Sequence, residues 1–217
     1  MVALTMGMIA APARATGHWI VLPLEKLTTN ISLLGEKDTV QSLTVKNSNI
    51  KIECPGFDAS TTLFPEGGGL AELKYSECST KSYSGGETLP CETRGSKDAK
   101  GSKAVTVLVK TSLISHEGET YVLVSPHEGT TFVTLIFGGA ECPFPESMPV
   151  TGSAVLKEAA PNTPATHLLR HLVEPAPQAL FASDVVKFGK TQAQLEGSAW
   201  LTLTGGHAGM EWGWTAS

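Results

Sequence analysis

The sequence has few charged and few aromatic residues. Of its 217 residues, 17% are charged and 6% aromatic, whereas 41% are hydrophobic, and the formal net charge is −5. Disordered chains combine low hydrophobicity with high net charge, so this composition indicates a folded protein. The chain is long enough to bury a core as one all-β domain or as two small domains.

Long runs of one residue class are missing. Beyond the N-terminus no stretch approaches the ~20 apolar residues of a membrane-spanning helix, so we expect no transmembrane segment. Basic residues gather only at Arg94, Lys97, Lys100 and Lys103, in a segment rich in Gly and Ser that we interpret as a solvated loop. Without a basic stripe we expect no nucleic-acid partner.

Motifs for catalysis are missing as well. Gly197-Ser198-Ala199 lacks the framing of a nucleophile elbow, and Gly67-Gly68-Gly69 is not followed by the lysine of a phosphate-binding loop. No pair stands out among the 21 acidic residues as a glycosidase pair. We therefore expect no enzyme, no catalytic residue and no cofactor, with a secreted hydrolase of unidentified acids as an alternative.

Helical periodicity does not persist for three turns anywhere, whereas alternating, β-branched segments between Gly, Pro and Ser are frequent. They predict about a dozen strands, at 18–24, 39–46, 49–54, 70–75, 103–113, 121–124, 131–137, 150–156, 167–173, 184–188, 192–204 and 207–214. This pattern is typical of an all-β antiparallel sandwich or barrel-like fold. We predict one domain over residues 16–217, with a weak possible boundary at the Pro-rich stretch 158–164.

Four cysteines, Cys54, Cys78, Cys91 and Cys142, are an even number without the close pairs of a zinc site. They predict two disulfides and an exported protein. Three pairings are possible. We favour Cys78–Cys91, which closes a short Ser- and Gly-rich loop, and hence Cys54–Cys142, which lie in matching Glu-Cys-Pro contexts.

The N-terminus supports export. Residues 1–15 are an apolar run that ends in Ala13-Arg14-Ala15, the pattern of a signal-peptide cleavage site. Because the basic start of a signal peptide is missing, we interpret these residues as a remnant whose true start lies upstream. The alternative is an ordinary buried segment. The predicted location is secreted or cell surface.

Two histidine motifs invite a metal-site interpretation, which the spacing argues against. His116-Glu117-Gly118 and His127-Glu128-Gly129 flank one predicted strand, roughly 20 Å apart, too far to share a zinc ion. They are predicted to be two turns with glycine at positive φ. His167 and His171 have helical zinc spacing, but Leu168 stands where a metalloprotease has glutamate. No metal site is predicted.

The C-terminal tail contains Trp200, Trp212 and Trp214, three of the four tryptophans. In a strand Met210, Trp212 and Trp214 share one face. That face is predicted either to pack in the core or to cover a self-association edge; alternatively, the three tryptophans form a ligand-stacking platform, for example for a cell-surface glycan.

Several short segments resemble uncharacterised exported β-rich proteins of soil bacteria. The similar segments run from Cys54 to the C-terminus and include Leu73-Lys74-Tyr75-Ser76-Glu77-Cys78, Phe137-Gly138-Gly139-Ala140-Glu141-Cys142, Val150-Thr151-Gly152-Ser153-Ala154-Val155 and Leu195-Glu196-Gly197-Ser198-Ala199. The resemblance implies export and a cysteine-bridged β fold, and it supplies no activity. We expect a non-enzymatic structural component of the cell surface or extracellular matrix that self-associates, or alternatively a carbohydrate- or ligand-binding module.

Overall fold

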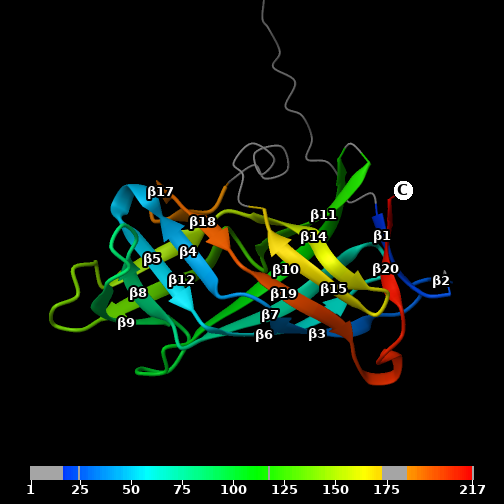
Figure 1. The fold of residues 1–217 in the computed structure, drawn as a ribbon, viewed down its shortest axis with the longest axis horizontal. Coiled ribbons are helices and arrows are strands. Elements are labelled where there is room, and N and C mark those ends of the chain that lie inside the picture. The colour runs from blue at the N-terminus through cyan, green and yellow to red at the C-terminus, as the bar shows by residue number, and fades with distance from the viewer. Residues whose placement is uncertain (1–16, 24, 117, 173–184, 217) are drawn as a thin grey trace, which may run out of the picture.

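The protein is built almost entirely from antiparallel β-strands, as the sequence predicts. The computed structural model describes residues 17–216 except 24, 117 and 173–184. Within these residues it contains twenty strands in three sheets, and the only helical segments are the 3₁₀ turns η1 (Lys46–Ser48) and η2 (Gly205–His207). Figure 1 shows the barrel between the larger sheet and the smallest one.

Eight strands close into a barrel, in the order β10-β11-β14-β15-β19-β3-β6-β7. Alternate residues of each strand face inward, and β3 shows this as a strict alternation of buried and exposed positions. The barrel strands are β3 (Ile31–Lys37), β6 (Gly56–Leu63), β7 (Gly68–Ser76), β10 (Val105–His116), β11 (Glu119–Pro126), β14 (Ala154–Thr163), β15 (Thr166–His171) and β19 (Ser198–Leu203).

A nine-stranded sheet packs against one side of the barrel, and a three-stranded sheet lies at the far end of the molecule (Figure 1). Buried residues of all three sheets belong to one hydrophobic core. The larger sheet has the order β17-β16-β13-β12-β9-β8-β5-β4-β18, and the smaller one β2-β1-β20. The strands are β4 (Gln41–Val45), β5 (Ile50–Cys54), β8 (Ser79–Ser82), β9 (Thr88–Gly95), β12 (Thr131–Gly138), β13 (Ser147–Thr151), β16 (Lys187–Phe188), β17 (Thr191–Gln192), β18 (Gln194–Glu196), β1 (Gly17–Val21), β2 (Glu25–Lys26) and β20 (Trp212–Ala216).

The stretch 158–164, which the sequence offered as an alternative to a single domain, lies in the β14–β15 hairpin. Residues 154–163 form β14, which pairs with β15 in a hairpin. The segment reads as Pro-rich, yet Thr163 still pairs with Thr166, and a register shift after Ala159 absorbs the irregularity. The predicted signal-peptide remnant, residues 1–15, lies outside the described residues.

Two disulfides are formed, but the predicted pairing is wrong. The bridges are Cys54–Cys78 and Cys91–Cys142, with Cα–Cα distances of 4.1 and 4.8 Å. The reason is strand register. β5 pairs with β8 so that Glu53 lies opposite Ser79, which places Cys54 beside Cys78.

The second bridge follows from another pair of strands that are distant in sequence. β12 pairs with β9 so that Gly138 lies opposite Glu92, and the chain then turns past Cys91. Gly139, at φ +109°, makes this turn, and a Cβ there would come within 2.5 Å of the Pro90 carbonyl oxygen. This close turn of the backbone places Cys142 next to Cys91, so that the two can form a disulfide.

His127-Glu128-Gly129 lies in a turn, as predicted, and Gly118 of the other motif lies in the turn between β10 and β11, whereas Glu117 lies outside the described residues. β10 ends at His116 and β11 begins at Glu119, and His127 directly follows β11. Gly118 and Gly129 have φ values of +82° and +59°, so both turns use the left-handed region that glycine tolerates.

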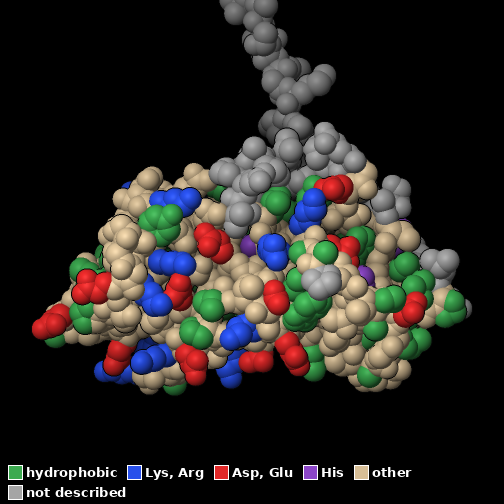
Figure 2. Space-filling view, in the orientation of Figure 1, with side chains coloured by type: hydrophobic (Ala, Val, Ile, Leu, Met, Phe, Trp, Pro, Cys, Tyr) green, Lys and Arg blue, Asp and Glu red, His purple; other side chains and the backbone are tan. Residues whose placement is uncertain are grey.

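The basic loop is a surface turn. Lys97, Lys100 and Lys103 are exposed, while Arg94 uses its Nη1 to donate to the carbonyl oxygens of Gly95 and Asp98. On the face drawn in Figure 2, acidic and basic side chains are interspersed over the surface without a large region of one sign. In the described part of the chain, no helix has the length and apolarity required to span a membrane.

Candidate functional site in the barrel interior

The interior of the molecule contains two adjoining cavities of about 90 Å³ each. The first lies between the barrel and the nine-stranded sheet, against Leu43, Phe132 and Leu135. The second lies inside the barrel toward the three-stranded sheet, against Trp19 and Trp212. Eight-stranded barrels have interiors that side chains just fill or that hold one small ligand, and this interior is not filled.

Small inward-facing residues leave the second cavity open. Ala59, Ala71 and Ala199 line it from β6, β7 and β19. Strands β3 and β6 lie close together at Gly35, where an added Cβ would be only 2.8 Å from the Ala59 Cβ. Elsewhere the lining is mostly aliphatic, for example Val109 and Val122. The sequence marks these positions only as alternating apolar residues, which do not distinguish a filled core from a cavity.

Three polar residues line both cavities: Gln41, Tyr75 and His171. The Gln41 Nε2 donates to the carbonyl oxygens of Thr39 and Ser198, at 3.0 and 2.8 Å. The His171 Nδ1 is buried without a hydrogen-bond partner among the described residues. Buried polar atoms are normally paired, so an unpaired one that borders a cavity marks a position where a bound molecule could supply the partner.

Burial sets the protonation of two of these groups. It lowers the pKa of His171 to about 4 and raises the pKa of Tyr75. His171 as a whole residue is half-buried, but its Nδ1 is buried and the residue borders both cavities. At neutral pH both side chains are uncharged.

The buried imidazole predicts that the protein loses stability in mild acid. In the unfolded chain a histidine titrates near 6.5, whereas His171 in the fold titrates near 4, so between these values the unfolded state binds more protons. The free energy of unfolding is expected to fall by about 3 kcal/mol from pH 6.5 to pH 4 through this group, with no contribution above that window. Denaturant melts of wild type and His171→Leu across this range measure the difference.

The exposed histidine His127 provides the matched control. His127→Gln replaces a histidine whose side chain is 41% exposed, and the acid-dependent loss of stability assigned to His171 is expected to remain in this variant. An unchanged acid slope in His171→Leu would contradict the burial of a neutral imidazole.

The tail tryptophans do not form one surface. Trp212 in β20 is 3% exposed, and Trp214 is half-buried against the same core. Trp200 lies in β19 between the inward-facing Ala199 and Leu201, so it points to the opposite face of that strand. Met210 precedes β20 and is 38% exposed, so it does not share the predicted strand face.

Trp212 and Trp214 instead pack with Trp19, the tryptophan that the tail interpretation did not include. The ring centroids of Trp19 lie 6.2 Å from Trp212 and 5.9 Å from Trp214. Trp19 Nε1 donates to the Gly68 carbonyl oxygen, and Trp212 Nε1 to that of Ala165, so the buried indoles are satisfied. Together they close the end of the barrel beside the second cavity.

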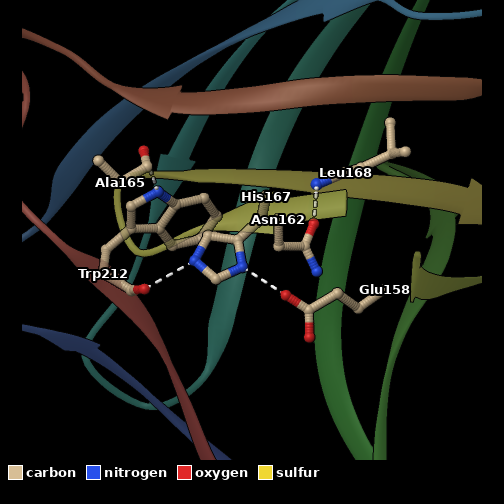
Figure 3. A network of polar contacts seen from close by, with 6 residues as sticks. All are labelled: Glu158, Asn162, Ala165, His167, Leu168 and Trp212. Carbon is tan, nitrogen blue, oxygen red and sulfur yellow. Dashed lines mark hydrogen bonds and ion pairs between the residues drawn. The ribbon is translucent and has the colours of Figure 1, made fainter. Parts of the chain in front are cut away.

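A histidine–glutamate pair completes this closure (Figure 3). His167 Nδ1 lies 2.5 Å from Glu158 Oε1, and His167 Nε2 donates to the Trp212 carbonyl oxygen at 2.7 Å. The ring also lies 4.5 Å from the Trp212 ring centroid. Both ring nitrogens of His167 therefore have hydrogen-bond partners. Through these contacts His167 and Glu158 link β20 to the β14–β15 hairpin.

His167 and His171 lie on the same face of β15, as the strand interpretation predicts. Four residues of strand separate them by about 13 Å, so they cannot bind one metal ion. Among the residues that the structure describes, no group of three His, Cys, Asp or Glu side chains could hold a metal. No family model, curated protein or solved structure matches the chain.

Proposed function

We propose that this protein is an exported, non-enzymatic binding protein that holds one small, mostly apolar molecule in its interior, within the barrel and between the barrel and the nine-stranded sheet. The observation that carries the proposal is the pair of adjoining cavities with an unpaired buried imidazole between them. The ligand-binding alternative thus gains support, with the site moved from a tryptophan surface to the interior. The two disulfides support export, because such bridges persist in oxidising compartments.

The size and lining of the cavities define the class of ligand. An apolar cavity of about 150 Å³ stays dry and binds benzene or xenon. Two cavities of about 90 Å³ together exceed that size. Their walls are largely aliphatic and aromatic, so apolar contact would supply most of the binding free energy.

Filling either cavity tests the proposal. Val107→Phe places a larger side chain in the first cavity and Val109→Phe in the second, because both valines face inward from β10. Wild type is expected to bind toluene with a Kd on the order of 1 mM or tighter, about −4 kcal/mol. The double variant is expected to lose this binding. Calorimetry measures it, and the fluorescence of Trp19 and Trp212 reports on the second cavity.

Leu108→Phe is the matched control. Leu108 lies between the two valines on the same strand and is 46% exposed, so the same substitution there leaves the interior unchanged. Val107→Leu and Val109→Leu repeat the test with a smaller volume change if the phenylalanine variants do not fold. Toluene binding that persists in all filled variants would contradict an interior site.

The second candidate function is a self-associating component of the cell surface or matrix. The observation in its favour is that β20 pairs only with β1, so its other side is a sheet edge. The first position of this edge is already covered, since the Trp212 N–H donates to the Pro164 carbonyl oxygen and its carbonyl accepts from His167. The edge available to a second chain is therefore short, which makes this candidate the weaker one.

A further inference from the structure

Five residues line both cavities: the apolar Leu73 and Val124 and the polar Gln41, Tyr75 and His171. We call the three polar residues the constriction. These residues come from opposite sides of the barrel. Tyr75 lies on β7, and His171 ends β15, which is four strands away in either direction around the eight-stranded ring. Gln41 stands beside His171, because Gly197 touches both: its carbonyl accepts from the His171 N–H, and a Cβ on it would lie 2.3 Å from Gln41 Oε1.

The constriction has unused hydrogen-bonding capacity. The Gln41 Nε2 donates to two backbone carbonyl oxygens, and the Oε1 of the same side chain remains available as an acceptor. The His171 Nδ1 is buried without a partner among the described residues, and Tyr75 lines both cavities with it. A neutral imidazole has one donor and one acceptor nitrogen, and a phenol can do both. The three side chains together therefore offer both kinds of partner in the region that borders both cavities.

Charged groups are scarce around this point. Among the lining residues only Glu196 carries a carboxylate, and it borders the first cavity alone. Lys51 is hydrogen-bonded to Glu53, which chiefly raises the pKa of Lys51, and the Glu196 carboxylate contributes to this pKa only through its more distant charge. Apart from Glu196, no charged group on the described wall would compensate an ion at the constriction, and burying an unpaired charge costs several kcal/mol.

We propose that the constriction recognises an uncharged hydroxyl group near the middle of a small molecule whose two apolar ends occupy the two cavities. This inference rests on the proposed binding function. A hydroxyl both donates and accepts, so it matches the paired capacity of Gln41, Tyr75 and His171, whereas a carbonyl only accepts. An interior that hydrogen-bonds a ligand hydroxyl discriminates against analogues that lack it, because its own polar groups are then left unpaired.

A series of probes built on one heptane skeleton tests the position and the charge of the polar group. Heptane, 1-heptanol, 4-heptanol, 4-heptanone, 4-aminoheptane and 2-propylpentanoate share a similar apolar volume, and the last two are charged at neutral pH. We expect 4-heptanol to bind about tenfold more tightly than heptane or 1-heptanol, with 4-heptanone intermediate. The two ions are expected to bind at least about tenfold more weakly than 4-heptanol.

Conservative substitutions identify the residues that cause the preference for 4-heptanol. Tyr75→Phe and His171→Leu are expected to remove most of the advantage of 4-heptanol while leaving heptane affinity within about twofold. Tyr83→Phe is the matched control, since Tyr83 is 43% exposed and lies outside both cavities, and it should retain the full preference.

The outcomes separate this inference from the proposed function. If all uncharged probes bind with equal affinity and cavity filling abolishes their binding, the interior site stands and the hydroxyl preference is wrong. If 4-aminoheptane binds best, Glu196 sets the selectivity and the inference is overturned. If no probe binds, or if the cavity-filling variants bind as wild type does, the proposed function fails and this inference fails with it.

Discussion

Truncation of the chain after Gly209 is expected to unfold the protein rather than to release a folded monomer. The deletion removes β20 with Trp212, which is 3% exposed, and takes away the rings that cover Trp19. Loss of one buried tryptophan side chain costs about 3–5 kcal/mol, and the deletion also breaks the five residue pairs of β1 with β20. A domain has only about 5–15 kcal/mol of stability to lose.

Single substitutions measure how much each tryptophan contributes to the free energy of unfolding. Trp212→Ala is expected to lower the free energy of unfolding by about 3–5 kcal/mol in denaturant melts. Trp200→Ala, on the outer face of the barrel, is expected to cost about 1 kcal/mol. A truncated chain that melts cooperatively as a monomer, from a wild type that is oligomeric, would instead show that the tail is an assembly edge.

Removal of the Cys91–Cys142 bridge is expected to cost about 4 kcal/mol, and removal of Cys54–Cys78 about 3.5 kcal/mol. The bridges close loops of 51 and 24 residues, and the longer loop gains more entropy in the unfolded chain when it is opened. Paired Cys→Ala substitutions avoid a free thiol, and denaturant melts measure each loss. With both bridges removed, the expected sum approaches the whole stability of a typical domain.

The unreduced protein provides the control for these variants. Thiol labelling of denatured wild type is expected to find no free cysteine, and each paired variant should retain one bridge. Peptide mapping should recover the peptides of Cys54 joined to Cys78 and of Cys91 joined to Cys142. Peptides joined as Cys78–Cys91 would mean that the strand register described for β5 and β8 is wrong.

Local pattern predicts much of the fold. The alternation at 39–46 and 49–54, with Asn47-Ser48-Asn49 between them, predicts the β4–β5 hairpin, and Asn49 does adopt a left-handed conformation at φ 51°. The strands β2, β3, β6, β8 and β9 were not among the predicted segments, and β2 has only two residues. β6 and β9 carry Gly, Pro or charged residues that weaken the alternation, and β8 has only four residues, too few for a period to emerge.

Composition and spacing by themselves determined an all-β chain with two disulfides and glycine turns, because these depend on residues close in sequence. Which cysteines pair, which tryptophans meet and where a cavity remains depend on contacts between distant segments. Cys54 meets Cys78 through the register of β5 and β8, and Trp19 meets Trp212 through the pairing of the first strand with the last. The space between Tyr75 and His171 exists only because the barrel closes with β7 opposite β15, and no local pattern records barrel closure.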